Sequence, residues 1–215
     1  MTHARGVLVV FEGVDRSGKS TQVAQLVSRL NALGHRSSAY RFPDRQTETG
    51  KLIDAYLSAS GGGLDDRTIH LLFAANRFVA EAMRSLRNSL MQGETVVVDR
   101  YAFSGVAYTL AKGAQGLDKD WCKSVDAGIL KPDIVFFLDI PTQDASQRGD
   151  YGLERYEKLE FQEKVRTCFL DLVDKSNWKI MDARQTKEAL SDEILGITTT
   201  MIQENGDKPL LPLWQ

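Results

Sequence analysis

Three short hydrophobic runs divide the chain, at residues 7–11, 95–98 and 133–138. Their hydrophobic residues are continuous and do not alternate with polar ones, which is typical of strands that are covered on both faces. Weaker runs at 38–42 and 178–181 predict two further strands. The pattern therefore indicates a central sheet of five mostly buried strands.

Hydrophobic residues at helical spacing fill much of the chain between these runs. They recur after Lys19 as far as Gly34, which is a typical helix stop signal. Further helices are predicted over 67–91, near Trp121, over 158–174 and over 187–204. Strands that alternate with helices form βαβ units, so we expect a mostly parallel sheet with its ligands at the carboxyl ends of the strands. The apolar segment at 208–214 is expected to pack on the body.

Composition narrows the class of protein. Hydrophobic residues make up 42% of the 215 residues and charged residues 26%, which is typical of one globular domain, here taken as 1–215. The net charge of −2 argues against a nucleic-acid polymer as a partner. The longest hydrophobic runs are far shorter than the roughly 20 residues that cross a membrane. These short runs lead us to expect no membrane association. Two cysteines make no disulfide framework, so we expect a cytoplasmic location, with a nuclear pool as the alternative.

Residues 13–20, with the sequence GVDRSGKS, match the phosphate-binding pattern G-x-x-x-x-G-K-[ST]. They lie between a predicted buried strand and a predicted helix, which is the context that this pattern requires. Backbone N–H groups at the helix N-terminus surround the phosphates, Lys19 reaches the outer ones, and the Ser20 hydroxyl can coordinate Mg²⁺. The sequence therefore predicts an α/β, three-layer P-loop NTPase fold, in which helices flank a mostly parallel five-stranded sheet, with ATP and Mg²⁺ bound at the loop.

Charged residues in and near the loop indicate phosphoryl transfer. Arg16 places a permanent cation where a built-in arginine finger would act, the alternative being an exposed arginine on a tight turn. Asp15 would be repelled by phosphates, so its carboxylate is expected to accept a hydrogen bond from a neutral donor such as a sugar hydroxyl. Asp99 and Arg100 follow a predicted strand directly, where the acid can hold the Mg²⁺ shell. A structural ion pair is the alternative for Arg100.

Further arginines indicate that the acceptor is an anion. Arg41 and Arg45 flank the end of a predicted strand, and Arg77 follows Phe73 by one helical turn. The ring could stack on a nucleobase while the guanidinium bonds its edge, although core packing is the alternative for Phe73. Transfer to a phosphate requires cations and no general base. The residues therefore favour a nucleoside monophosphate kinase.

Two other functions stay open at this point. A deoxynucleoside kinase would share the loop and the fold but phosphorylate a sugar hydroxyl, and a nucleotide-binding regulator would show no turnover. A regulatory GTPase is not favoured, because the chain has no N-K-x-D, the guanine-reading tetrapeptide. The charged segment at 148–157 suits a lid that closes over a charged ligand, the alternative being a solvated loop.

The chain resembles the thymidylate kinases, of the eukaryotic type, within the P-loop nucleoside monophosphate kinases. The strings that carry the resemblance run in order along the chain: FEGVDRSGKSTQ, YRFPDR, HLLFAANR, VVDRYAFSGVAY, DKDWC, LKPD and GLERYEKLEFQEKV. At one position the chain departs from the family pattern: Val125 precedes Asp126, where a Pro-Asp pair is expected. This difference affects only the expected conformation of the local turn. The resemblance implies conversion of ATP and dTMP to ADP and dTDP, on the way to dTTP, and a homodimer paired through helices on one side of the sheet.

The resemblance also implies roles for individual residues. Arg16, Lys19, Asp99 and Arg100 are expected to be catalytic, with Ser20 and Asp99 at the metal. ATP would contact Gly13, Arg16, Ser17, Gly18, Lys19, Ser20, Thr21 and Arg148, with Arg148 packed on adenine. The residues implied for dTMP are Asp15, Phe42, Arg45, Phe73, Arg77, Arg100, Ser104, Gly105, Tyr108, Tyr156 and Gln162. Arg148 and Arg155 belong to the lid, and the division of labour between Arg16 and Arg155 stays open.

Overall fold

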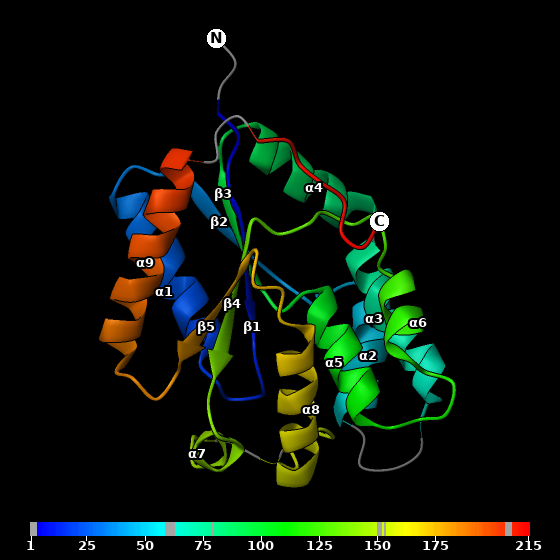
Figure 1. The fold of residues 1–215 in the computed structure, drawn as a ribbon. Helices are drawn as coiled ribbons and strands as arrows, with labels where there is room; N and C mark the ends of the chain where they lie inside the picture. Colours follow the sequence, from blue (N-terminus) through cyan, green and yellow to red (C-terminus); the bar gives the residue numbers. More distant parts are fainter. Residues whose placement is uncertain (1–3, 59–62, 79, 150–151, 153, 205–207) are drawn as a thin grey trace.

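A five-stranded sheet forms the centre of the computed structural model, which describes residues 4–58, 63–78, 80–149, 152, 154–204 and 208–215 (Figure 1). The strands are β1 (Leu8–Glu12), β2 (Ser37–Arg41), β3 (Thr95–Asp99), β4 (Ile134–Asp139) and β5 (Trp178–Asp182). They lie in the order β2-β3-β1-β4-β5, and all neighbouring pairs are parallel. The five predicted strands are confirmed, and the sheet expected to be mostly parallel is parallel in every described pair.

Helices cover both faces of this sheet. The described residues form α1 (Lys19–Ala32), α2 (Glu48–Ser58), α3 (Asp66–Phe78), α4 (Ala80–Met91), α5 (Ala102–Ala111), α6 (Lys119–Ser124), α7 (Thr142–Ser146), α8 (Leu159–Leu172) and α9 (Lys187–Glu204). Figure 1 shows α1 and α9 on one side of the sheet and α5 and α8 on the other. The three-layer α/β fold predicted from the sequence is therefore confirmed.

The sequence pattern does not predict α2, α5 or α7. Eight of the ten residues of α5 are buried, so this helix has no polar face that would reveal a helical period. α7 is only five residues long, too short for a periodic pattern. The helix predicted over 67–91 is described as α3 and α4, on either side of residue 79, which lies outside the described residues.

The hydrophobic core fixes the edge of the sheet where the strands end. All five residues of β1 and all five of β3 are buried, as expected for strands covered on both faces. Phe11 of β1 lies level with Asp99 of β3 and Phe136 of β4. The loops that follow these strands therefore begin at the same edge of the sheet, where a ligand would bind.

The predicted docking of the segment at 208–214 is confirmed for the described residues from Lys208 onward. Pro212 forms an isolated antiparallel bridge with Leu130, and the buried Leu213 belongs to the main core. The Trp214 ring stands edge-on to Phe103 of α5, with the ring centroids 5.4 Å apart. Among the described helices, none has the length and hydropathy that crossing a membrane requires.

Candidate active site

The phosphate-binding loop connects β1 to α1 at the carboxyl edge of the sheet. The backbone turns sharply there, with positive φ angles at Gly13 (149°), Arg16 (62°) and Gly18 (99°). Glycine adopts such angles without strain, which explains the two glycines of the motif. The loop borders a cavity of about 840 Å³, here called the loop cavity. Of the predicted residues, its wall includes Asp15, Arg16, Ser17, Gly18, Lys19, Ser20, Thr21, Arg45, Asp99, Arg100 and Arg148.

Lys19 is buried at the centre of the loop. Its Nζ donates hydrogen bonds to Gly13 O at 3.1 Å, to Val14 O at 2.7 Å and to Ser17 Oγ at 3.2 Å. Burial lowers the pKa of Lys19 to about 7, and repulsion by the Arg100 cation adds to the shift. Its hydrogen-bond partners in the described part of the chain are neutral oxygens, so the ammonium form gains from any anion that enters the loop.

Ser20 and Asp99 stand side by side where β3 and α1 meet the loop. Ser20 Oγ donates to Asp99 Oδ2 at 2.6 Å, and Arg41 Nε lies 3.6 Å from the same oxygen. Asp99 Oδ1 is buried and has no hydrogen-bond partner among the described residues. The described residues contain no cluster of three or more His, Cys, Asp or Glu that could hold an ion alone. The oxygens of Ser20 and Asp99 fit Mg²⁺, which prefers oxygen ligands and takes most of its shell from water and phosphates.

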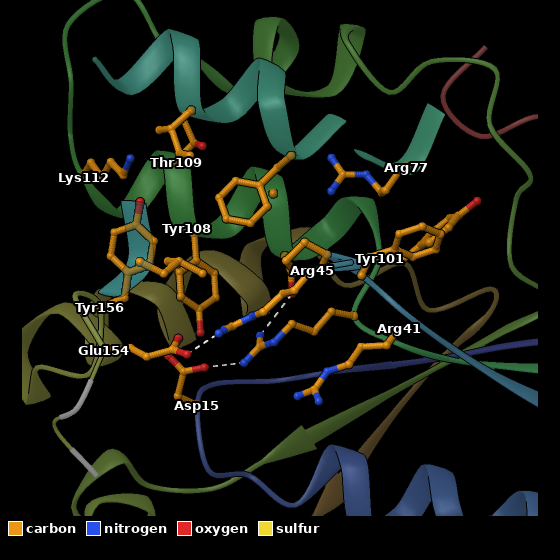
Figure 2. Close-up of a pocket in the computed structure, with 18 residues that line it drawn as sticks. Asp15, Arg41, Arg45, Arg77, Tyr101, Tyr108, Thr109, Lys112, Glu154 and Tyr156 are labelled. Atoms are coloured by element: carbon orange, nitrogen blue, oxygen red, sulfur yellow. Dashed lines mark hydrogen bonds and ion pairs between the residues drawn. The ribbon is translucent and has the colours of Figure 1, made fainter. Parts of the chain in front are cut away.

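A second cavity adjoins the loop cavity and is here called the aromatic cavity (Figure 2). Of the predicted residues, its wall includes Asp15, Phe42, Arg45, Phe73, Arg77, Arg100, Ser104, Gly105, Tyr108 and Tyr156. Thr109 of α5 and Lys112, the residue directly after this helix, also line it and were not predicted. Five residues belong to both cavities: Asp15, Arg41, Arg45, Arg100 and Glu154. The two cavities therefore meet at three arginines and two carboxylates.

Arg100 is the best-anchored arginine at this junction. Its backbone has a φ of 65°, and its Nη1 donates to Gly13 O at 3.1 Å and to Ser104 Oγ at 3.3 Å. Its Nη2 bonds the Asp15 carboxylate. Gln162, predicted to contact dTMP, lies behind Asp15 instead of in either cavity wall: it donates to Asp15 Oδ2 at 2.7 Å and accepts from Asp15 N at 2.9 Å. The Asp15 carboxylate is thus held between a cation and an amide.

Arg45 is bound differently, because both of its partners are carboxylates. Its Nη1 donates to Asp54 Oδ1 and its Nη2 to Glu154 Oε1, each at 2.6 Å. The Arg45 side chain is 44% exposed, and its two partners are similarly accessible. An entering anion can therefore replace these carboxylates as the partner of Arg45 at little cost in free energy, since exposed ion pairs contribute little stability.

Glu12 is a buried acid at the carboxyl end of β1 that the sequence interpretation overlooked. Its Oε1 accepts hydrogen bonds from Tyr101 N and Ser104 N, both at 2.9 Å, and its Oε2 accepts from Ser104 Oγ at 2.5 Å. Burial raises the pKa of Glu12, while the bond from Ser104 and the charge of Arg100 oppose that shift. Glu12 therefore caps the N-terminus of α5. An acid closing a hydrophobic run next to the glycine motif is the signal that could have identified it.

The lid predicted at 148–157 is described except for residues 150, 151 and 153. Arg148 crosses the loop and donates to Arg16 O at 2.9 Å and to Ala183 O at 2.7 Å. Glu157 accepts from Arg16 Nε at 3.0 Å. Arg155 lines neither cavity: its Nε donates to Tyr56 O at 2.9 Å and its guanidinium lies 4.2 Å from the centre of the Tyr56 ring. In this conformation Arg16 faces the loop cavity and Arg155 packs on α2.

Arg77 and Phe73 both line the aromatic cavity from α3, as their spacing predicts. Phe73 is half-buried and also packs against the small cluster formed by Ile53, Tyr56, Leu57 and Ile69. The buried Arg77 is paired with Asp126, at the turn that follows α6. Asp126, which the sequence interpretation connected only with a local turn, therefore touches a predicted site residue.

Comparison with known proteins agrees with this geometry. The family model described as thymidylate kinase matches residues 11–194. The chain is 46% identical to the thymidylate kinase of Homo sapiens over 217 residues, covering 100% of both chains, and 48% identical to that of Arabidopsis thaliana over 98% of this chain and 78% of the relative. The solved structure of thymidylate kinase from Candida albicans superposes with a TM-score of 0.86 at 37% identity, covering 98% of this chain and 99% of that one. The resemblance read from the sequence is thus confirmed, and this chain belongs to the thymidylate kinase family.

Proposed function

We propose that this chain transfers the γ-phosphoryl group of ATP to dTMP, giving ADP and dTDP, with ATP in the loop cavity and dTMP in the aromatic cavity. Thymidylate kinase activity follows from the family, which uses ATP. The observation that carries the assignment of the two cavities is their junction at Arg41, Arg45 and Arg100. Two phosphate-bearing substrates repel each other, and cations placed where they meet offset that repulsion.

The donor side is assigned to the loop. Lys19 and the backbone N–H groups would bind the outer phosphates, and Arg16 would neutralise charge that develops during transfer. Ser20 and Asp99 would hold Mg²⁺, which supplies charge neutralisation at the phosphates when bound. Arg148, anchored across the loop, would pack on adenine.

The acceptor side needs no general base, because the attacking phosphate oxygen of dTMP is already an anion. Arg45 and Arg100 would hold this phosphate, with the Glu154 and Asp54 carboxylates displaced from Arg45. Asp15 would accept a hydrogen bond from the 3′-hydroxyl of the sugar. This role is supported by the hydrogen bond from Gln162, which holds the Asp15 carboxylate at the junction of the two cavities. Phe73 would stack on thymine, Arg77 would donate to its carbonyl edge, and Ser104, Gly105, Tyr108 and Tyr156 would complete the wall.

We also propose a homodimer paired through helices on one side of the sheet. Leu71 and Phe78 of α3 support this arrangement, because 48% and 43% of their surfaces are exposed although both are large and apolar. The cytoplasmic location stays a prediction.

One assay separates the proposed function from its alternatives. ADP release is measured from ATP and Mg²⁺ with dTMP, with thymidine or with no acceptor, and again with the metal chelated. We expect turnover with dTMP that disappears on chelation. Turnover with thymidine but not with dTMP would identify a deoxynucleoside kinase, and nucleotide binding without turnover would favour a regulator.

The lowered pKa of Lys19 predicts that ATP binding takes up protons. With a pKa of about 7, the Lys19 amine is neutral in most molecules of the free protein at about pH 8. The phosphates of ATP favour its ammonium form. Calorimetry of ATP binding at about pH 8 in two buffers of different ionisation enthalpy should therefore give different apparent enthalpies, with an uptake of up to about one proton. Lys19→Met should abolish the difference. Equal enthalpies for the wild-type protein would contradict this prediction.

A further inference from the structure

The guanidinium of Arg77 is fixed by a residue far along the chain. Its Nε and Nη2 donate to Oδ1 and Oδ2 of Asp126 at 2.8 and 2.5 Å. Only 2% of the Arg77 side chain and 0% of the Asp126 side chain are exposed. Two parallel hydrogen bonds fix the plane of a guanidinium as well as its position.

α5 supplies a second constraint on the same guanidinium. A Cβ atom at Gly105 would lie 2.9 Å from Arg77 Nη2, so the absence of a side chain leaves the space that the guanidinium fills. Figure 2 shows the guanidinium end of Arg77 directed toward the interior of the aromatic cavity. Among the described residues, Arg77 Nη1 makes no hydrogen bond. Because Asp126 holds Nε and Nη2, it also fixes the position and direction of Nη1, the nitrogen that remains to donate to a ligand.

We propose that Asp126 is a positioning residue that determines base specificity by fixing Arg77. This proposal rests on the proposed function, in which the base of dTMP lies in the aromatic cavity. The carboxylate compensates the charge of Arg77, so the base meets a directed donor and not a mobile cation. A donor fixed in this way pairs with a carbonyl oxygen of thymine, whereas the amino group of cytosine would point its hydrogens at it. Without Asp126, the guanidinium could turn toward the phosphates at the junction.

Asp126→Asn keeps the size of the side chain but places an amide N–H₂ against a donor nitrogen of Arg77. We expect kcat/KM for dTMP to fall by about tenfold or more, chiefly through a higher KM for dTMP. The KM for ATP should stay unchanged, because nothing in this pair faces the loop cavity. The ratio of kcat/KM for dTMP to that for dCMP should fall, since the donor is no longer fixed.

Asp133→Asn is the matched control. Asp133 makes a similar pair with Arg5, at 2.7 and 2.8 Å, with side chains 12% and 7% exposed. It directly precedes β4, at the edge of the sheet opposite the cavities. We expect this control to lower the thermal unfolding temperature without changing the dTMP-to-dCMP ratio. If Asp126→Asn behaved in the same way, its role would be structural and the proposal would be wrong.

A double-mutant cycle tests whether Asp126 acts through Arg77. In Arg77→Gln the donor is already altered, so adding Asp126→Asn should change the dTMP-to-dCMP ratio by less than about twofold. The double variant leaves no buried charge unpaired, and circular dichroism verifies that Arg77→Gln, in which the Asp126 carboxylate has lost its partner, is folded before the two ratios are compared. A large further fall of the ratio in the double variant would overturn the proposal. If the wild-type protein does not phosphorylate dTMP, the proposed function itself is wrong, whereas wild-type turnover with an unchanged ratio in folded Asp126→Asn overturns only the role of Asp126.

Discussion

Lys19→Ala is expected to lower the rate of dTDP formation by about 10²-fold or more, the largest loss from any single change in the loop. Among the described residues, the buried Lys19 Nζ donates hydrogen bonds to oxygens of the loop, so the nitrogen is in place before ATP binds and the phosphates then favour its ammonium form. A preorganised charge of this kind stabilises the transition state without reorganising. Steady-state ADP release measures the effect, and circular dichroism verifies that the variant is folded.

The control for this experiment is Lys51→Ala. Lys51 is 62% exposed, and its ion-pair partner among the described residues is Glu48, one turn away on α2, an interaction that contributes little. Its loss should leave turnover near the wild-type rate. Near-normal turnover in a folded Lys19→Ala protein would mean that the loop is not the donor site.

Arg100→Ala is expected to have the second largest effect, on the acceptor. Its guanidinium is anchored by Gly13, Ser104 and Asp15, so it meets the phosphate of dTMP already oriented. Losing a partly buried, charge-assisted contact costs about 1.5–3 kcal/mol, so kcat/KM for dTMP should fall roughly ten- to hundredfold. The KM for ATP should change much less.

Arg45→Ala provides the comparison within the same site. Arg45 is more exposed than Arg100 and is held by carboxylates that must be displaced, so its loss should affect dTMP in the same sense but less. Steady-state kinetics with each substrate varied in turn measures both variants. If Arg100→Ala raised only the KM for ATP, Arg100 would belong to the donor side and the acceptor assignment would be wrong.

The parts of the fold that were predictable have local signatures. A buried parallel strand is a continuous hydrophobic run, and the phosphate-binding loop is a fixed spacing of glycine, lysine and serine. α5 has no such signature, because its small and apolar residues are buried on nearly every side. The resemblance implies Ser104, Gly105 and Tyr108 for dTMP, but only the tertiary structure shows that all three lie on one helix that lines the aromatic cavity.

The sequence by itself determined the five strands, the phosphate-binding loop and the family, because each depends on residues that are close together in the chain. The tertiary structure alone decided which charges meet. Arg77 and Asp126 are 49 positions apart, and Arg100 and Asp15 are 85 apart, yet each pair is in contact. Pairing over such separations follows from how the carboxyl ends of the strands and α3, α5 and α6 pack together. The sequence predicts roles for these arginines, and folding gives their guanidinium groups a fixed orientation, since a buried cation is stable only where a carboxylate or carbonyl oxygens receive it.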